Sequence, residues 1–311
     1  AWQIIQMARH PDRPHSKDFI KALITDPVFL SGDRITGRCP ATLACVGIID
    51  QQPVVVVSQS KGRSIQERMD HQYGMPNPCG YRLALRAFKL AEQYNYPIIT
   101  LIDTPGAFPG IDGEIQNQSA AISENLLFLS QVKVPVINIV IGEGMSGGAL
   151  GIGVGDRLAM LRNSILAVIS PEGCASILWR DPSKSLQAAE AMKLTAKDLL
   201  KLKIIDEVIP EPLGGAHRDP DAIAADIKFS IVKNLKNFES FSKEEIYDHR
   251  KSKFLQIGRD QGFSKSSNIT DGGLSYKGSV FNKLKSQINK NKYVYAGFGV
   301  IVIIGLIALL S

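Results

Sequence analysis

The sequence contains few cysteines, and their placement excludes the common zinc modules. The chain has 311 residues and four cysteines, Cys39, Cys45, Cys79 and Cys174. No two of them form a C-x-x-C pair and no histidine couple stands near them, so no metal site of the knuckle or ribbon type is expected. So few cysteines in a chain of this length are typical of a reducing compartment. We therefore expect four buried free thiols.

The sequence also lacks the basic surface that nucleic acid requires. The formal net charge is +6, but six lysines lie between Ser264 and Lys292 against a single aspartate. No charged residue follows Lys292, so residues 1–263 are nearly neutral. Because binding to DNA or RNA depends on a cationic face, no nucleic-acid partner is expected. With 44% hydrophobic residues, the chain can bury one large core or two modest ones.

An apolar segment at the C-terminal end stands apart from the rest of the sequence. Residues 293–310, YVYAGFGVIVIIGLIALL, carry no charge and approach the ~20 residues that a helix needs to cross a bilayer. Residues 264–292 are rich in Ser, Asn, Gly and Lys, which predicts a basic flexible linker on the cytosol-like side. We expect a globular domain over 1–263, this linker, and a transmembrane anchor over 293–310. The alternative is that the apolar segment packs into a partner or the core.

Strands and helices alternate through the middle of the chain. Hydrophobic periodicity predicts strands over 54–58, 97–103, 134–141, 165–169 and 204–209. The same periodicity predicts helices over 81–94, 114–131, 171–179, 186–192 and 196–200, one opening near 147, and one or two between 219 and 256. This alternation predicts an α/β fold with a largely parallel sheet, whose ligands bind at the carboxyl ends of the strands.

The glycine-rich segment 141–155, IGEGMSGGALGIGVG, directly follows a predicted strand and fits several motifs. Gly142, Gly144 and Gly147 match the dinucleotide pattern G-x-G-x-x-G, but the carboxylate expected about 20 residues later is missing. The P-loop spacing is present without the lysine that reaches the phosphates, which excludes that motif. A third pattern, G-x-S-x-G, makes Ser146 a candidate hydrolase nucleophile, with Asp206 and His217 following in the order of a hydrolase.

A fourth interpretation uses only the backbone. Gly147 and Gly148 at the start of a helix expose N–H groups that, with the helix dipole, stabilise an oxyanion. A second loop, DTPGAFPG at 103–110, follows the preceding strand and offers the N–H groups of Gly106 and Ala107. The structural alternatives are close helix–strand packing for the first loop and a simple chain reversal for the second.

Several segments of the chain resemble one known family, the α chain of acetyl-CoA carboxylase carboxyltransferase. The similar segments are MARHPDRPHSKDFI (7–20), KGRSIQERMDHQYGMPNPCGYRLALR (61–86), LIDTPGAFPG (101–110), IGEGMSGGALGIGVGD (141–156), ISPEGCASILW (169–179) and IPEPLGGAHRDP (209–220). The resemblance covers about residues 1–250.

The resemblance implies a crotonase-like fold of repeated ββα units, of the ClpP/crotonase superfamily, in a multi-subunit bacterial or plastid enzyme. The implied reaction moves a carboxyl group from carboxybiotin, held on a biotin carboxyl carrier protein, to acetyl-CoA, and gives malonyl-CoA for fatty acid synthesis. The implied partners are a β subunit with a zinc ribbon, the carrier protein and biotin carboxylase, in an α2β2 hetero-oligomer that is active only with β. No metal is expected in this chain.

The resemblance also assigns roles to particular residues. It makes Gly147 and Gly148, opposite Gly106 and Ala107, the backbone donors that hold charge on the biotin ureido oxygen. The expected biotin-binding residues are Gly144, Met145, Ser146, Gly147 and Gly148. Since the family has glycine where Met145 stands, its side chain is expected either to narrow the biotin entrance or to restrict the backbone angles of the turn. The basic residues expected either to contact CoA or the carrier, or to form a solvated face, are Lys61, Arg63 and Arg68.

The tail after residue 264 is outside the family pattern. Together with the resemblance, it predicts a copy tethered to a membrane, either the plastid inner envelope facing the stroma or the bacterial membrane facing the cytoplasm. Two alternatives for function stay open. One is a membrane-anchored scaffold subunit of the same complex, and the other is a biotin-independent acyl-CoA enzyme of the crotonase fold.

Overall fold

The computed structural model describes residues 1–258. The predicted linker and anchor, 264–292 and 293–310, lie outside the described residues. Within residues 1–258 we find no helix whose length and apolar character would let it span a bilayer.

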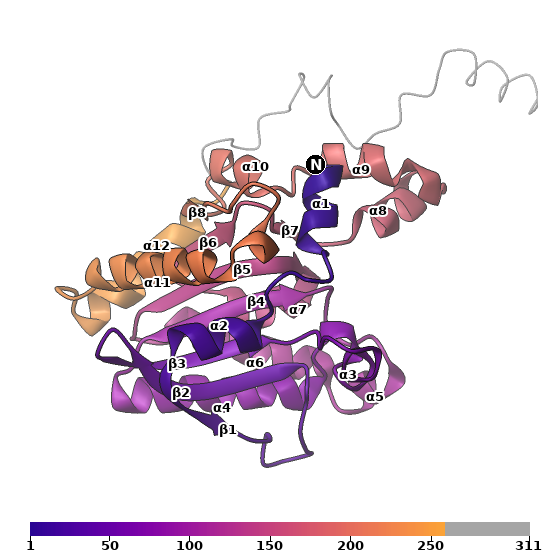
Figure 1. Cartoon of the computed structure of the whole chain (residues 1–311). Coiled ribbons are helices and arrows are strands. Elements are labelled where there is room, and N and C mark those ends of the chain that lie inside the picture. The colour runs from indigo at the N-terminus through magenta and orange to yellow at the C-terminus, as the bar shows by residue number, and fades with distance from the viewer. Residues whose placement is uncertain (259–311) are drawn as a thin grey trace, which may run out of the picture. The chain divides into compact units, whose positions relative to one another are not determined.

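The described strands form one eight-stranded sheet. The strands are β1 (Thr25–Leu30), β2 (Thr42–Ile49), β3 (Gln52–Gln59), β4 (Ile98–Thr104), β5 (Val136–Met145), β6 (Arg157–Leu161), β7 (Ile165–Ala167) and β8 (Glu207–Ile209). Their order is β1-β2-β3-β4-β5-β6-β8, with β7 also paired to β5 (Figure 1). The pairs β1–β2 and β2–β3 are antiparallel, and every other pair is parallel.

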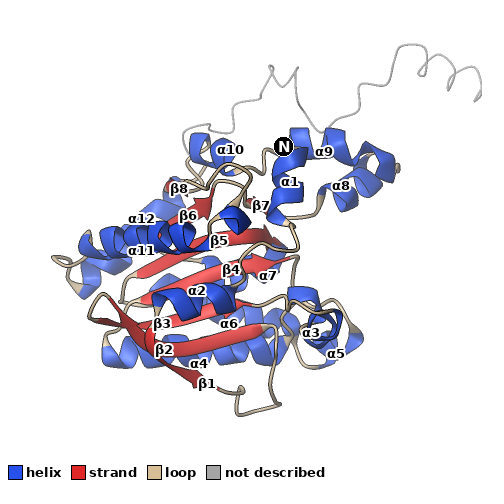
Figure 2. Ribbon diagram, in the orientation of Figure 1, coloured by secondary structure: helices blue, strands red, loops and turns tan. Residues whose placement is uncertain are grey.

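Twelve α-helices and three 3₁₀ turns connect these strands within residues 1–258 (Figure 2). The helices are α1 (Trp2–Ala8), α2 (Ser16–Leu23), α3 (Ile65–Asp70), α4 (Pro78–Tyr94), α5 (Ile111–Ile115), α6 (Gln118–Gln131), α7 (Ser146–Gly153), α8 (Pro171–Leu178), α9 (Ser185–Met192), α10 (Ala196–Lys201), α11 (Pro220–Lys236) and α12 (Lys243–Gln256). The 3₁₀ turns are Gln72–Gly74, Pro182–Lys184 and Ala216–Arg218.

The sheet is covered on both faces, as parallel strands require. Side chains of α2, α11 and α12 pack on one face, where they meet Val56, Leu101 and Ile139 of the central strands. Helices α4, α6 and α7 cover the opposite face (Figure 1). There they pack against Val55, Ile102 and other side chains of a second core cluster. All residues of β4 and β5 are buried, so the two strands that lead to the glycine-bearing loops lie in the centre of the core.

The expectation of an α/β fold with a largely parallel sheet is confirmed. The predicted helix over 114–131 is divided into α5 and α6, because Asn117 adopts a left-handed conformation with φ of 61°. The predicted strand over 204–209 is shortened to β8, since its first residues belong to the connection after α10. The elements α1, α2, β1, β2, α3 and β6 were not among the predicted ones.

Strand β5 changes neighbours along its length. Its first half, Ile137 to Val140, pairs with β6, and its last three residues, Glu143 to Met145, pair with β7. The chain then turns sharply into α7 at Ser146, whose φ of 55° is left-handed. This change places the glycine-rich turn at the carboxyl end of the parallel strands, where the sequence predicts a ligand to bind.

Candidate functional site

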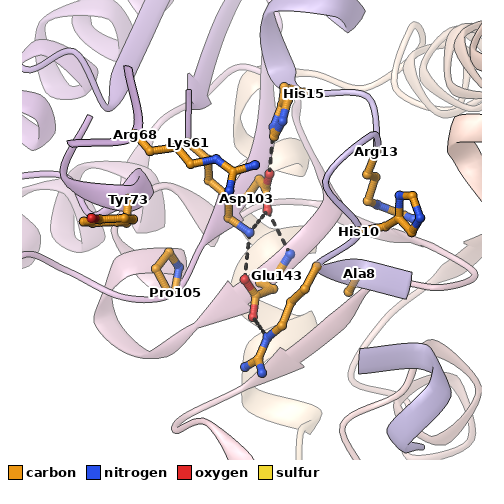
Figure 3. Close-up of a pocket in the computed structure, with 11 residues that line it drawn as sticks. Ala8, His10, Arg13, His15, Lys61, Arg68, Tyr73, Asp103, Pro105 and Glu143 are labelled. Carbon is orange, nitrogen blue, oxygen red and sulfur yellow. Dashed lines mark hydrogen bonds and ion pairs between the residues drawn. The ribbon is translucent and has the colours of Figure 1, made fainter. Parts of the chain in front are cut away.

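Three charged side chains meet at the carboxyl ends of β3, β4 and β5 (Figure 3). The Nζ atom of Lys61 lies 2.7 Å from Asp103 Oδ1 and 2.7 Å from Glu143 Oε2. The backbone N–H of Glu143 also donates to Asp103 Oδ1 at 3.0 Å, which ties β5 to β4. Asp103 and Glu143 are buried, and the Lys61 side chain is 17% exposed. The strand ends are therefore held together by one ammonium between two carboxylates.

The segment between α1 and α2 forms one wall of this site. Arg9 Nε lies 2.6 Å from Glu143 Oε1, and its guanidinium also bonds Glu172 of α8 at 2.9 Å. Arg13 is buried, donates to the carbonyl oxygen of Ile141 at 2.7 Å and pairs with both carboxylate oxygens of Glu211. Both arginines thus fix the N-terminal segment to the end of β5.

The ion pairs keep these buried groups charged. Burial opposes ionisation of Asp103, but the charge and hydrogen bond of Lys61, the nearby His15 ring and the backbone N–H of Glu143 hold the pKa of Asp103 well below its usual range. Burial likewise opposes the charge of Lys61, yet Asp103 and Glu143 raise the pKa of its ammonium. The pKa of Glu211 is lowered against burial by Arg13. Asp103, Lys61 and Glu211 are therefore ionised at neutral pH.

A small cavity of about 230 Å³ opens beside the cluster. It is lined by Ala8, Arg9, His10, Arg13, His15, Lys61, Arg68, Tyr73, Asp103, Pro105 and Glu143 (Figure 3). The Nε2 atom of His15 is buried without a hydrogen-bond partner, and the Arg68 guanidinium has no ion pair within the described part of the chain. These two groups are the donors that a small polar ligand would find unoccupied.

The two glycine-bearing loops are in direct contact. A Cβ atom built on Gly148 would lie 2.4 Å from the carbonyl carbon of Gly106 and 2.7 Å from the backbone nitrogen of Ala107. Only glycine fits there, because real Cβ atoms do not approach backbone so closely. Gly147 differs, since a Cβ at that position would meet only the Ile122 side chain at 3.6 Å. The proximity of the loops after β4 and β5, expected from the sequence, is present.

The backbone donors of these loops differ in availability. The N–H of Gly106 already donates to the Thr104 hydroxyl at 3.1 Å, so the expected donor role does not suit it. Ala107 has no hydrogen-bond partner for its N–H within residues 1–258. Helix α7 begins after Met145 without a side-chain cap, and the first N–H groups of a helix have no partner within the helix. The available donors are thus those of Ala107 and of the first turn of α7.

A buried glutamine links the charged cluster to the glycine turn. Gln59 Nε2 donates to the carbonyl oxygen of Gly148 at 2.6 Å, and its Oε1 accepts from the backbone N–H of Asp103 at 3.1 Å. The Tyr81 hydroxyl also donates to Gly148 at 3.4 Å. Gln59 was not among the residues singled out by sequence, and neither were Asp103, Arg9 or Arg13. These four residues share one feature: each is polar and lies either at the end of a buried strand or opposite such an end.

The side chain of Met145 does not line the cavity. It is buried in a small cluster with Ile5 and Ala8 of α1, Ile165 of β7 and Leu194. Its thioether therefore packs away from the opening, in contrast to the expectation that it narrows the entrance.

The residues of the hydrolase alternative are not assembled. Ser146 is exposed, and its hydroxyl forms no hydrogen bond within residues 1–258. His217 stacks on His10 with ring centroids 3.9 Å apart, and Asp206 pairs with Lys253 at 2.6 Å. A nucleophile needs a base within hydrogen-bond reach, so the geometry gives this alternative no support.

The three basic residues of the predicted CoA or carrier contact lie in different surroundings. Lys61 is held between two carboxylates, Arg63 pairs with Asp18 of α2 on the surface, and Arg68 borders the cavity.

The expectation of free thiols is confirmed for all four cysteines, which are buried. Among the described residues no group of His, Cys, Asp and Glu forms a metal site.

Comparisons with known proteins identify the same family that the sequence resembles. A family model described as "Acetyl co-enzyme A carboxylase carboxyltransferase-like" matches residues 1–258. The "Acetyl-coenzyme A carboxylase carboxyl transferase subunit alpha" of Pelagibacter ubique (strain HTCC1062) is 49% identical over 306 residues, 98% of this chain and 83% of that protein. The protein of the same name from Edwardsiella ictaluri (strain 93-146) is 51% identical over 258 residues, 83% of this chain and 81% of that one.

Solved structures of carboxyl-transferring and decarboxylating enzymes share the fold. Transcarboxylase 12S with methylmalonyl-coenzyme A and methylmalonic acid bound superposes with a TM-score of 0.60 at 17% identity, over 74% of this chain and 44% of that one. A chain of the Pseudomonas malonate decarboxylase hetero-tetramer in complex with coenzyme A gives a TM-score of 0.61 at 14% identity, over 78% of this chain and 98% of that one. At these identities the likeness establishes the fold alone.

Proposed function

This chain belongs to the alpha-subunit family of acetyl-coenzyme A carboxylase carboxyl transferase, and from that premise we propose how its residues take part in carboxyl transfer. It is a carboxyltransferase component of the enzyme that forms malonyl-CoA. The substrates are carboxybiotin on the carrier protein, which supplies the carboxyl group, and acetyl-CoA, which accepts it. The observation that carries the proposal is the contact between Gly148 and the Gly106–Ala107 peptide, which brings free backbone donors together.

The backbone N–H groups of Gly147, Gly148 and Ala107 hold the negative charge that develops on the biotin ureido oxygen as the carboxyl group departs. Gly147 and Ala107 are half-buried, so the donors are reachable and yet partly shielded from water. A donor fixed before the reaction costs no reorganisation, and removing one such donor lowers kcat by about 10²–10³. The open space around Gly147 leaves room for a substrate group above the turn.

The charged cluster positions this turn. Lys61, Asp103 and Glu143 hold the ends of three strands in register, and Gln59 connects Asp103 to the Gly148 carbonyl. None of these side chains has to change its protonation during the reaction. Arg68, which borders the cavity without an ion pair in the described chain, and the surface residue Arg63 are the proposed contacts for CoA phosphates or the carrier.

The test compares two substitutions at one position in the assembled enzyme. Gly147→Pro removes the N–H while proline is tolerated in the first turn of a helix, and Gly147→Ala retains the N–H. Carboxyl transfer is measured with the full chain, a zinc-ribbon β subunit and carboxybiotin. We expect Gly147→Pro to lose about 10²–10³ in kcat and Gly147→Ala to lose far less. Equal activities of the two variants, with assembly intact by gel filtration, would show that the N–H of Gly147 holds no charge.

The same assay separates the alternative functions. Activity only in the presence of the β subunit supports the carboxyltransferase, whereas activity on an acyl-CoA without biotin would support the biotin-independent enzyme. A complex that assembles and yet transfers no carboxyl group would support the alternative that this chain is a scaffold subunit. Ser146→Ala distinguishes the hydrolase, because the backbone mechanism predicts little loss.

We propose the same partners as for the family: a zinc-ribbon β subunit, the biotin carboxyl carrier protein and biotin carboxylase, in an α2β2 arrangement. A tether formed by residues 293–310, after a domain over 1–263 and a linker over 264–292, is part of this proposal. The family match ends at residue 258, but the match to the Pelagibacter ubique protein covers 98% of the chain and so includes most of this tail. The relatives named above are bacterial, which favours the bacterial membrane over the plastid envelope.

A further inference from the structure

Two of the four cysteines lie side by side, although they are 40 positions apart in the sequence. Cys39 is in the loop before β2, and Cys79 is in the first turn of α4. With Ala41 they form a small buried cluster of their own, in which the Cys79 thiol donates to Asn77 Oδ1 at 3.0 Å and the Thr42 hydroxyl donates to Cys39 Sγ at 4.0 Å. Cys45 lies in the core beneath α2 and α11, and Cys174 lies in the cluster of α8 and α9. The four thiols thus divide into one pair and two isolated groups.

The surroundings of Cys39 favour its thiolate. The neighbouring Cys79 thiol, the backbone N–H groups of Asn77 and Ala41 and the Thr42 hydroxyl act against the effect of burial, so that the pKa of Cys39 is lowered to about 7. The same contact with Cys39, together with burial, raises the pKa of Cys79. By contrast, burial raises the pKa of Cys45 to about 12, and it raises that of Cys174. Since the thiolate is the reactive form, Cys39 is the most nucleophilic of the four.

Cys39 also borders a cavity of about 350 Å³ beside β1 and β2. The cavity is lined in part by the cations Lys17 and Arg38 and by His71. Of the two thiols only Cys39 belongs to a residue that lines this cavity, so a small polar oxidant that enters it meets Cys39 first. An attacking thiolate with a second thiol in contact is the arrangement of a redox-active pair.

We propose that Cys39 and Cys79 are a peroxide-sensitive dithiol that closes to an intramolecular disulfide. The Cys39 thiolate attacks one peroxide oxygen, the O–O bond breaks, and the sulfur becomes a sulfenic acid as the other oxygen leaves as water with a proton from solvent. The Cys79 sulfur then attacks the Cys39 sulfur, the S–O bond breaks, and the second oxygen leaves as water with the Cys79 proton. Two thiols and one hydrogen peroxide give one disulfide and two waters. A dithiol reductant reverses the step.

The experiment treats the reduced full-length chain with hydrogen peroxide, blocks the remaining thiols by alkylation and maps the products by peptide mass spectrometry. We expect two thiols to be lost together, with a peptide that links Cys39 to Cys79 and disappears on reduction. In the untreated protein, Cys39 alkylation should rise as the pH passes about 7, ahead of the other three cysteines. Circular dichroism confirms that the fold is retained.

Four single variants test the assignment. In the Cys79→Ala variant, oxidation by peroxide should stop at the sulfenic acid of Cys39, which a 1,3-dione reagent traps. The Cys39→Ala variant should retain its three remaining thiols under peroxide. The matched controls Cys45→Ala and Cys174→Ala should form the disulfide as the wild type does. Either of two results overturns the proposal: a disulfide that includes Cys45 or Cys174, or a folded wild-type chain that retains all four thiols under peroxide.

Discussion

The side-chain amide of Gln59 donates to the carbonyl oxygen of Gly148 at 2.6 Å, across 89 positions of the sequence. The same side chain accepts from the backbone N–H of Asp103 at 3.1 Å, and Gln59 is only 1% exposed. One buried side chain therefore sets the spacing between the end of β3, the end of β4 and the first turn of α7. If the glycine turn holds charge during carboxyl transfer, Gln59 is the residue that positions it.

Two substitutions at Gln59 give opposite expectations for the pH dependence of the assembled enzyme. Gln59→Leu removes both hydrogen bonds, and each buried group left without a partner costs about 1–3 kcal/mol, so we expect a lower kcat at every pH. Gln59→Glu keeps both bonds only while the new carboxyl is protonated, since its ionised form cannot donate to Gly148. Its kcat relative to wild type should therefore rise as the pH is lowered. A Gln59→Glu profile parallel to that of wild type would argue against this role.

Lys61 is expected to be essential for stability. Lys61→Met removes the ammonium and leaves the buried carboxylates of Asp103 and Glu143 without their shared partner. Breaking a buried ion pair from one side costs about 3–5 kcal/mol, so urea unfolding should show a loss of this size. The matched control is Lys89→Met, at an exposed lysine of α4. A Lys61→Met protein as stable as the control would mean that water or protonation compensates the carboxylates.

Substitution of Arg250 in α12 should destabilise the protein as much as substitution of Lys61, for a different reason. Its side chain is 1% exposed and donates to the carbonyl oxygens of Leu129, Val132 and Val134 at 2.6 to 2.8 Å, while pairing with buried Asp156. Arg250→Met leaves the three carbonyls and the carboxylate uncompensated. We expect the free energy of unfolding to fall by about 3–5 kcal/mol in a urea titration. A loss under about 1 kcal/mol, as for surface substitutions, would contradict the structure.

Acid should destabilise the loop between β1 and β2. Burial opposes the charge of Asp33, but hydrogen bonds from the backbone of Gly37 and Ile35 and from Thr36 lower its pKa to about 2. A lowered pKa means that the ionised form stabilises the fold, so this stabilisation is complete above the unfolded pKa of about 4 and is lost as the pH falls toward about 2. Asp33→Asn should flatten the decline of the urea midpoint across this window. A slope identical to that of wild type would show that other carboxylates account for it.

The parallel part of the sheet could be predicted from the sequence, whereas the antiparallel pairing of β2 with β3 could not. Buried parallel strands such as β4 are continuous apolar runs, which are easy to recognise. The turn between β2 and β3 places Asp50 and Gln51 at positive φ, 47° and 68°, where a two-residue hairpin normally carries glycine or asparagine. Without that signal the hairpin was missed. The five-residue strand β6 was missed because it is short.

The sequence singles out the two glycine loops and Lys61, but it does not show that Lys61 contacts Asp103 and Glu143. Pattern alone brought the loops of Gly106 and Gly148 together, because both follow neighbouring parallel strands. The cluster of Lys61, Asp103 and Glu143 depends on contacts across 40 to 82 positions, which a local pattern cannot show. The rule that ligands bind at the carboxyl ends of strands, applied to polar residues as well as glycines, would have added Asp103 and Glu143 to Lys61.

The wall that Arg9 and Arg13 build has a consequence for the order in which the site forms. These arginines are made before their carboxylate partners, Glu143 and Glu211, which follow 134 and 198 positions later in the chain. During synthesis from the N-terminus, Arg9 therefore cannot pair with Glu143, nor Arg13 with Glu211, until these carboxylates have emerged. Contacts of such long range slow folding, because the intervening chain must be ordered first. A nascent chain arrested before Glu211 should accordingly leave this segment accessible to protease, and chain completion should close it.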